Sequence, residues 1–235
     1  MPPRHHRALA EHGSSYLIDV PMLGEGTLVD PAYRLDAAEV FGRSAPLVVE
    51  IGSGGGDCVV HAAQEHPELD FLAVEVWRPG VAQTIAKAVH EDVRNIRLMC
   101  ADAAQALPAM LGDGSVRELW TFFPDPWPKT KHHKRRLVQP EFADKVANLL
   151  KPQGVWRLAT DWADYAWQIR DVVEECPALR NPHAGRLADP GDPAVDPRGD
   201  HGGFAPRFDG RVLTRFERKG LRVGRVVRDV EAIAR

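Results

Sequence analysis

The sequence predicts a doubly wound α/β fold, in which a mostly parallel sheet carries helices on both faces. Short apolar runs of strand length alternate with longer segments of helical spacing, which is the order of βα units. A glycine-rich turn, GSGGG at 52–56, follows the first apolar run. Acidic residues stand where later runs end, and the carboxyl ends of strands are where open α/β sheets bind ligands.

The first half of the chain predicts three strand and helix units. Each unit begins with a short apolar run, which turn residues separate from the helical segment. Pro79 suits the first turn of the second helix, because the N–H that proline lacks would be unpaired there. The predicted strands are 47–51, 71–76 and 96–100, and the helices run from 57 to about 66, from 80 to about 92, and onward from Asp102.

The second half continues the alternation and then departs from it. Residues 181–206 contain five Pro and five Gly, which predicts a long loop. Beyond it we expect two strands, 212–217 and 221–229, joined by a turn at Lys219-Gly220, that complete the sheet at an antiparallel edge. The other elements expected here are strands at 118–123 and 155–160, helices at 141–150 and 165–176, and a stop at 151–154.

Length and composition bound the organisation of the chain. The 235 residues suffice for one sizeable core, so we expect one domain over 41–235, preceded by an arm at 1–40 that is partly disordered on its own. No apolar run approaches the roughly 18 residues of a membrane span, and the first residues lack the apolar core of a signal peptide. We expect a cytoplasmic protein with no membrane contact. The three cysteines are far apart, so no metal site is predicted.

Positive charge is concentrated in two segments of an otherwise acidic chain. Residues 129–136 carry +5, and residues 205–235 carry nine Arg or Lys against four acids, again +5. Because the net charge is −3, the remainder carries −13. This contrast predicts a localised site for a polyanion the size of an RNA.

The segment FFPDPWPKTKHHKRR at 122–136 joins a constrained acid to one of these cationic segments. Pro124 and Pro126 fix the backbone around Asp125 in an extended turn at the end of a predicted strand. A basic run alone is most often a solvated face, and Pro-Asp-Pro alone is an ordinary turn. Their combination at a strand's carboxyl end favours a positioned acid beside a nucleic-acid contact.

The glycine turn and three acids predict a nucleoside pocket. Gly52 and Gly54 let the backbone approach a ligand closely, next to Glu50. Glu75 ends the next strand, where a carboxylate can bind both hydroxyls of a ribose, and Asp102 ends the third, facing an adenine amino group. No basic residue accompanies the glycines, which disfavours a phosphate-bearing cofactor and favours S-adenosylmethionine. A nicotinamide dinucleotide and purely structural acids are the alternatives.

Taken together, these segments resemble the bacterial tRNA (guanine-N(7)-)-methyltransferase family, within the class I S-adenosylmethionine-dependent methyltransferases. The resemblance rests on FPDPWPK at 123–129, KHHKRR at 131–136, ATDW at 159–162 and TRFE at 214–217, while EIGSGGG at 50–56 is shared more widely in the class. It implies a seven-stranded sheet and transfer of a methyl group from S-adenosylmethionine to the 7-nitrogen of a guanine in the tRNA variable loop. tRNA is the expected partner, and no obligate protein partner is expected.

The resemblance also implies roles for individual residues. Asp125 is implied to be the catalytic residue and, like the residues of the nucleoside pocket, to lie on the cofactor side. The implied cofactor residues are Glu50, Gly52, Gly54, Glu75, Asp102 and Asp125, the implied substrate residues are Lys129, Asp161, Thr214, Arg215, Phe216 and Glu217, and the implied RNA contacts are Lys131, His132, His133, Lys134, Arg135 and Arg136.

Guanine N7 carries an in-plane lone pair and no proton, so the predicted reaction needs alignment and charge stabilisation instead of a base. We expect Asp125 to stabilise the positive charge that develops on the purine. We expect Asp161 and Glu217 to accept hydrogen bonds from the guanine edge, and Trp127 either to stack on a base or to pack under the loop. The rival hypotheses are a methyltransferase for another substrate and a catalytically silent RNA-binding module on the same scaffold.

Overall fold

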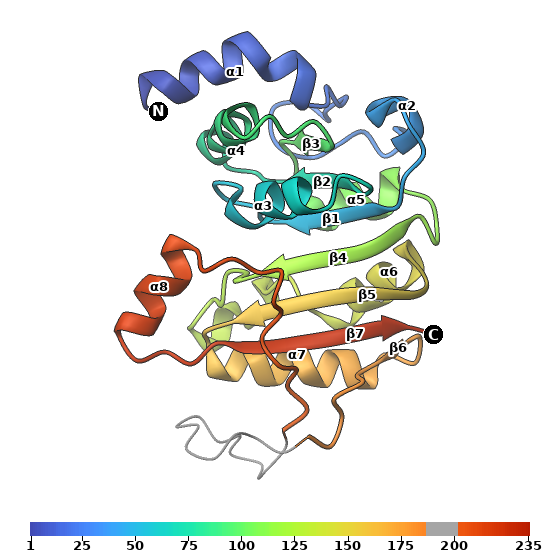
Figure 1. Ribbon diagram of the computed structural model, residues 1–235. Helices are drawn as coiled ribbons and strands as arrows, with labels where there is room; N and C mark the ends of the chain where they lie inside the picture. The colour runs from blue at the N-terminus through green and yellow to red at the C-terminus, as the bar shows by residue number, and fades with distance from the viewer. Residues whose placement is uncertain (187–201) are drawn as a thin grey trace. The chain divides into compact units, whose positions relative to one another are not determined.

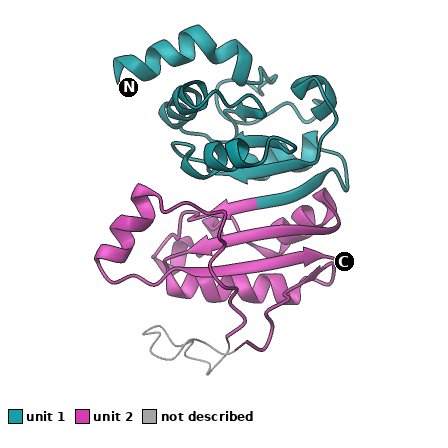
Figure 2. Cartoon of the chain, in the orientation of Figure 1, with its two compact units in different colours: residues 1–119 teal, residues 120–235 magenta. Residues whose placement is uncertain are grey.

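The computed structural model describes residues 1–186 and 202–235 and confirms the α/β fold (Figure 1). Its seven strands form one sheet in the order β3-β2-β1-β4-β5-β7-β6. The chain divides into two compact units, residues 1–119 and 120–235, so the boundary falls within β4 (Figure 2). The prediction of a single domain over 41–235 stays a prediction.

Three parallel strands form the centre of the first unit. β1 (Leu47–Ile51) pairs with β2 (Asp70–Val74), which pairs with β3 (Ile96–Met99). Every residue of β1 and β2 is buried, because helices cover both faces of such a sheet and leave no side for water. The helices that follow the three strands are α3 (Asp57–Glu65), α4 (Arg78–His90) and α5 (Ala103–Met110), as the sequence predicts.

The first 41 residues contain two helices that the sequence analysis did not predict, α1 (Pro3–Tyr16) and α2 (Ala37–Phe41). The residues that α1 buries are His5, Gly13 and Tyr16, which do not form a recognisable apolar stripe. α1 packs against α4, and the Tyr16 hydroxyl donates to the Val93 carbonyl oxygen at 2.9 Å. The partial disorder expected of this arm on its own stays a prediction.

The second unit combines a mixed sheet with the remaining helices. β5 (Leu150–Thr160) pairs antiparallel with β7 (Arg228–Ala234), which also pairs antiparallel with β6 (Leu179–Arg180). The antiparallel edge is therefore confirmed. The remaining elements of this half are β4 (Val116–Phe122), the 3₁₀ helix η1 (Thr130–Arg135), α6 (Pro140–Leu149), α7 (Ala163–Glu175) and α8 (Arg215–Arg222).

The two strands predicted at 212–217 and 221–229 are wrong. Thr214 caps a helix there: its hydroxyl accepts from the Glu217 backbone N–H at 3.1 Å, so the Thr-x-x-Glu spacing is a helix start. The strand begins only at Arg228. The stop predicted at 151–154 agrees with the end of α6 at Leu149, but the next strand, β5, begins at Leu150, before the predicted start at 155.

Two further predictions concern the long loop and membrane-spanning segments. Of the predicted loop 181–206, residues 187–201 lie outside the described residues. Within the described parts of the chain, no helix has both the length and the apolar character needed to cross a membrane.

Candidate active site

The turn after β1 leaves open space in front of its first two glycines. Gly52 and Gly54 have φ angles of 71° and 55°, a region that favours glycine. A Cβ built at either position would meet no atom within 4 Å. The turn therefore presents bare backbone toward free space, as a site for a nucleoside requires.

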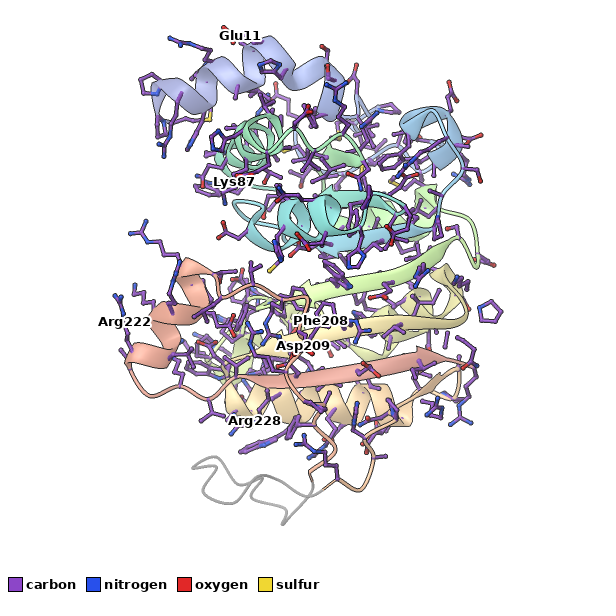
Figure 3. All side chains as sticks on the ribbon, viewed as in Figure 1. Glu11, Lys87, Phe208, Asp209, Arg222 and Arg228 are labelled. Carbon is purple, nitrogen blue, oxygen red and sulfur yellow. The ribbon has the colours of Figure 1, made fainter. Side chains whose placement is uncertain are left out.

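α4 supports this turn from the other side. A Cβ at Gly80 would lie 2.4 Å from the Gly54 carbonyl oxygen, so only glycine allows the helix this close. Lys87, labelled in Figure 3, donates to the Gly55 carbonyl oxygen at 2.7 Å and forms an ion pair with Asp57. Neither Gly80 nor Lys87 was singled out from the sequence, because these contacts join segments about 25 to 32 residues apart.

Glu75 is fixed by the backbone that surrounds it. Its Oε2 accepts from the Gly54 N–H at 2.7 Å, and its Oε1 accepts from the Trp77 N–H at 2.8 Å. The residue is 8% exposed. Each carboxylate oxygen can accept more than one hydrogen bond, so the carboxylate is oriented and can still bind hydroxyl groups.

Glu50 is a buried acid at the end of β1. Burial raises the pKa of its carboxyl to about 8, with the nearby charges of Asp57 and Glu75 adding to the rise, and a hydrogen bond from the Val59 backbone opposes it. Among the described residues, its buried Oε2 has no hydrogen-bond partner. A buried acid oxygen without a partner suits a cationic group of a ligand.

Asp102 follows β3 and caps α5. Its Oδ1 accepts from the backbone N–H groups of Ala104 and Gln105, at 2.9 and 3.3 Å. The cap accounts for one carboxylate oxygen and fixes the orientation of the other. Its predicted contact with an adenine amino group stays a prediction.

Two strained residues bracket Asp125 in the second unit. Phe123 and Trp127 have φ angles of 53° and 44°, which are unusual for bulky side chains. Each precedes a proline, and the Phe123 N–H donates to the Ala159 carbonyl oxygen at 2.7 Å. Asp125 itself is exposed. Strain of this kind persists only where surrounding contacts impose it, and it concentrates at functional sites.

Arg136 imposes much of this shape from inside the protein. Its side chain is 2% exposed, and its Nε donates to the Pro126 carbonyl oxygen at 2.8 Å. Its other nitrogens donate to Gln168 at 2.7 Å and to Asp164 at 2.6 Å, and its guanidinium lies over the Tyr165 ring. This structure corrects the prediction of Arg136 as an RNA contact, because the side chain is buried and committed to the loop that carries Asp125.

The rest of the cationic run lies at the surface. Trp127 packs within the loop, with its ring centroid 5.9 Å from that of His132 and the Arg135 guanidinium 5.0 Å above its ring. His133 lies next to Arg136 and Asp164. The exposed cations of the run are Lys129, Lys131, Lys134 and Arg135.

Both acids predicted to read guanine are bound to arginines. Asp161 accepts from Arg225 Nη1 at 2.9 Å. Glu217 is 2% exposed and lies 3.3 Å from both Arg207 and Arg211. Arg211 is fully buried and also pairs with Asp229, which raises the pKa of its guanidinium against the effect of burial.

Of the implied substrate residues at 214–217, Thr214 and Glu217 shape the start of α8 while Arg215 and Phe216 are exposed. The Phe216 ring lies 5.3 Å from that of Phe123, so the structure brings this segment next to the Asp125 loop. On the cofactor side it brings Glu75 to Gly54. Sequence reasoning missed Arg211 and Asp229, whose pairing has no local signal.

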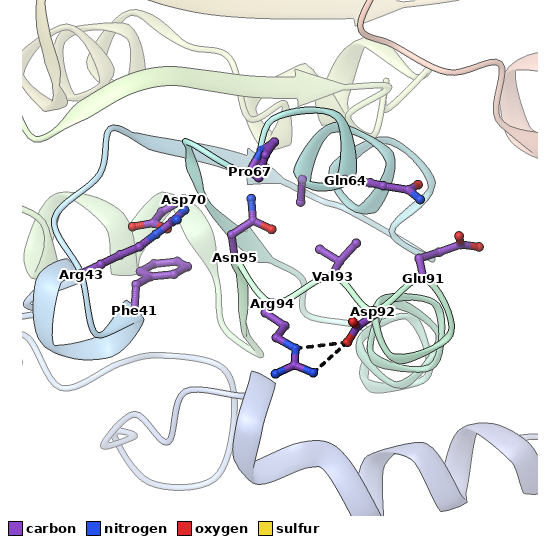
Figure 4. Close-up of a pocket in the computed structure, with 11 residues that line it drawn as sticks. Phe41, Arg43, Gln64, Pro67, Asp70, Glu91, Asp92, Val93, Arg94 and Asn95 are labelled. Carbon is purple, nitrogen blue, oxygen red and sulfur yellow. Dashed lines mark hydrogen bonds and ion pairs between the residues drawn. The ribbon is translucent and has the colours of Figure 1, made fainter.

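A separate cavity of about 420 Å³ lies at the other ends of the strands in the first unit (Figure 4). Asp70, which begins β2, and Asn95, which precedes β3, line it with Arg43 and Phe41. Glu75 and Asp102 follow the carboxyl ends of the same strands, so this cavity is distinct from the predicted cofactor residues. Among the described residues, no three His, Cys, Asp or Glu side chains gather as a metal site would require.

Comparison with known proteins places the chain among methyltransferases. Residues 44–197 match the family described as "Putative methyltransferase". A tRNA (guanine-N(7)-)-methyltransferase of Arthrobacter sp. (strain FB24) is 44% identical over 258 residues, which cover 97% of this chain and 81% of that protein. The protein of the same name from Cutibacterium acnes (strain DSM 16379 / KPA171202) is 44% identical, covering 95% and 76%.

Solved structures share the fold at much lower identity. The 16S rRNA methyltransferase KamB has a TM-score of 0.58 at 17% identity, over 92% of this chain and 99% of its own. TrmN from Thermus thermophilus has a TM-score of 0.52, also at 17% identity, over 85% and 47%. At this identity the likeness supports the fold alone.

Proposed function

The chain belongs to the tRNA (guanine-N(7)-)-methyltransferase family, and from this premise we propose how its residues divide the work of the reaction. The enzyme transfers a methyl group from S-adenosylmethionine to the 7-nitrogen of a guanine in tRNA, on a class I methyltransferase fold. The observation that carries this assignment is 44% identity along 97% of the chain. We place the guanine in the variable loop of tRNA and the reaction in the cytoplasm, without an obligate protein partner.

The residues after β1 and β2 fit S-adenosylmethionine. When bound, this group supplies an electrophilic methyl group on a sulfonium sulfur. The open backbone at Gly52 and Gly54 takes the nucleoside, and the oriented carboxylate of Glu75 binds ribose hydroxyls. The unpartnered oxygen of Glu50 suits the ammonium group. Lys87, a cation that contacts the turn, is committed to Gly55 and Asp57, which agrees with a ligand that carries no phosphate.

Asp125 serves the methyl step as a fixed negative charge. Guanine N7 needs no deprotonation, so the protein's task is to hold its lone pair in line with the methyl group, at about 3 to 3.5 Å. Positive charge then develops on the purine. The two prolines, the strained neighbours and the Arg136 anchor constrain the Asp125 backbone, so less reorganisation is needed for its carboxylate to stabilise that charge.

Asp161 selects guanine through the hydrogen-bond donors of the base. Adenine lacks the ring N–H next to the amino group, so a carboxylate acceptor at this position discriminates between the two purines. The Asp161 side chain is 7% exposed and pairs with Arg225, whose side chain is 44% exposed. We therefore assign Asp161 the direct contact with the base and Glu217, with its two arginine contacts, the support of the segment that surrounds it.

Mass spectrometry of tRNA nucleosides tests this function directly. Purified protein alone is incubated with S-adenosylmethionine and tRNA that lacks the modification, and the tRNA is then digested to nucleosides. We expect 7-methylguanosine, and fragment mapping should place it in the variable loop. Methylation of another base or atom, or of protein extract in preference to tRNA, would overturn the proposal. A requirement for a second protein would overturn the proposed absence of an obligate protein partner.

A further inference from the structure

α8 is a helix that the protein itself barely buries. Of its eight residues only Glu217 and Gly220 are buried, and the remaining six are exposed. Exposed apolar side chains surround the same segment: Leu213, Phe216, Leu221, Val223 and Val226 are between 37% and 70% exposed. A helix with so little packing within its own unit presents most of its surface to a partner or to water.

The exposed cations of α8 form a single stripe. Arg215, Arg218, Lys219 and Arg222 stand at positions i, i+3, i+4 and i+7, which share one face of a helix. At 100° per residue this face lies opposite the one that Glu217 and Gly220 bury. Arg222 extends from the outer side of α8 in Figure 3. Like charges at this spacing disfavour a helix, so internal stability does not explain the stripe.

The buried face of α8 lies against Asp161, the residue that we assign to guanine. A Cβ at Gly220 would lie 2.8 Å from Asp161 Oδ2, so the helix passes directly over that carboxylate. Arg225, just beyond the helix, pairs with the same oxygen and with no other acid among the described residues. Phe216 joins the helix to Phe123 of the Asp125 loop. The outward cations are thus fixed relative to the proposed base site.

We propose that Arg218, Lys219 and Arg222 bind phosphates of the tRNA backbone, as a second RNA contact beside the cationic run at 129–135. The inference rests on the proposed function and adds a surface to it. Cations that are held in place next to a base-binding site can bind backbone phosphates of the same nucleic acid whose base enters that site, and such contacts position the base. Insertion into an anionic membrane would require a wide apolar face opposite the cations. In α8 that face is formed by Glu217 and Gly220, and the apolar Phe216 and Leu221 lie only at its borders.

The test replaces Arg218, Lys219 and Arg222 together with glutamine, which has similar helix propensity. The matched control replaces Arg117, Lys145 and Arg180, three exposed cations outside the site, and so removes the same charge. Filter binding measures tRNA affinity across salt concentrations for the wild type and both variants. S-adenosylmethionine binding and the unfolding temperature report whether each variant is folded.

We expect the α8 variant to bind tRNA roughly tenfold or more weakly at low salt, with a salt slope smaller by about 2 to 3. Its cofactor affinity should be unchanged and its unfolding temperature not lowered, because repulsion within the stripe is removed. The control should bind tRNA almost as tightly as the wild type. Equal weakening in both variants, or an unchanged slope in the α8 variant, would overturn the inference.

Two further outcomes keep the inference separate from the function on which it rests. If the wild type forms 7-methylguanosine while the α8 variant binds tRNA normally, only the inference fails. If the wild type forms none, the proposed function fails. Binding of the wild type, but not the α8 variant, to phosphatidylglycerol vesicles with normal tRNA affinity in both would assign the stripe to a membrane and overturn the proposal.

Discussion

At the scale of single residues, Glu75 shows how one carboxylate both holds a turn and offers itself to a ligand. Its two oxygens accept the N–H groups of Gly54 and Trp77, so the turn and the start of α4 depend on the same side chain. The sequence could predict that Glu75 ends a strand about 20 residues after the glycines. It could not predict the hydrogen bond to Gly54, because the bond depends on how two strand ends meet.

Replacing Glu75 with alanine should weaken S-adenosylmethionine binding by about 1.5 to 3 kcal/mol, or roughly ten- to hundredfold in Kd. The weakening comes from the missing ribose contacts and from release of the Gly54 N–H. Calorimetry measures it, with Glu65→Ala on the exposed side of α3 as the control. tRNA affinity should hardly change. Cofactor binding like that of the wild type would show that the pocket has been assigned wrongly.

Asp125→Asn should keep the fold and most of the tRNA affinity but slow the methyl step by about 100-fold or more. The amide keeps the shape of the side chain and removes the charge that stabilises the purine. Single-turnover methylation at saturating cofactor measures this, because cofactor affinity is also expected to fall somewhat. Asp113→Asn, in the exposed turn before β4, is the control.

The same assay separates Asp125 from the neighbouring histidines. Because N7 carries no proton, the wild-type methyl step should be nearly flat between about pH 6.5 and 8.5, without an inflection near the ordinary histidine pKa of about 6.5. A normal rate for Asp125→Asn would contradict the mechanism. So would a rate that follows a histidine titration and disappears in His132→Ala or His133→Ala.

At the scale of elements, the segment from 129 to 136 joins two roles that the sequence could not separate. Its density of cations predicts a nucleic-acid contact, and the exposure of Lys131, Lys134 and Arg135 agrees with that role. Arg136 looks the same in the sequence, yet it is buried against Asp164 and Gln168 of α7. Partners 28 and 32 residues away leave no mark on the local pattern.

Replacing the exposed cations and replacing Arg136, in two separate variants, should give opposite results. Changing Lys131, Lys134 and Arg135 to glutamine should weaken the binding of all tRNAs alike, without a change in protein stability. The salt dependence of tRNA affinity should become shallower, by about 0.7 to 0.9 in slope for each phosphate that is no longer bound. Arg136→Gln should cost about 1 to 3 kcal/mol of unfolding free energy through its broken hydrogen bonds. Urea titration and filter binding of both variants make the comparison, and equal stability of Arg136→Gln and wild type would contradict the anchor role.

Strand and helix elements differed in how well the sequence predicted them. Buried parallel strands such as β1, in which Glu50 is the one polar residue, are nearly continuous apolar runs, which are easy to recognise. The residues of α8 were predicted as parts of two strands, 212–217 and 221–229, joined by a turn at Lys219-Gly220, although the Thr214-x-x-Glu217 spacing is a helix start. α1 was missed because it buries histidine, glycine and tyrosine against α4. In the first case a local capping signal was overlooked, and in the second tertiary contacts decided the outcome.

At the scale of the whole molecule, charge is distributed to suit a large anionic substrate. The segments 129–136 and 205–235 carry +5 each on a chain whose net charge is −3. Within the second segment, Arg211 and Arg207 are used internally against Glu217, while the cations of α8 face outward. Composition alone predicted the polyanion, but only the structure divides these arginines into supports and surface contacts.

Glu50 makes two properties of the whole molecule depend on pH, its stability and its affinity for the cofactor. Burial raises the pKa of this carboxyl from 4.5 to about 8 in the folded protein. Between these values the folded state keeps a proton that the unfolded state has released. The folded state therefore binds more protons, and the contribution of Glu50 to the unfolding free energy falls as pH rises from about 5 to 8.

Glu50→Gln removes the titration of this carboxyl, so comparing the variant with the wild type isolates the contribution of Glu50. The unfolding free energy of the variant should rise relative to wild type as pH increases from 5.5 to 8, since all other groups titrate in both proteins and cancel in the difference. Urea titrations at the two pH values measure it.

A bound ammonium group favours the ionised carboxylate, so the wild type should also gain affinity for S-adenosylmethionine relative to Glu50→Gln over the same range, by up to about tenfold per pH unit. Calorimetry in two buffers of different ionisation enthalpy should detect the proton that Glu50 releases on binding. A stability difference between the two proteins that stays constant with pH would show that Glu50 is already ionised in the folded protein, and an affinity ratio that stays constant would remove it from the ammonium site.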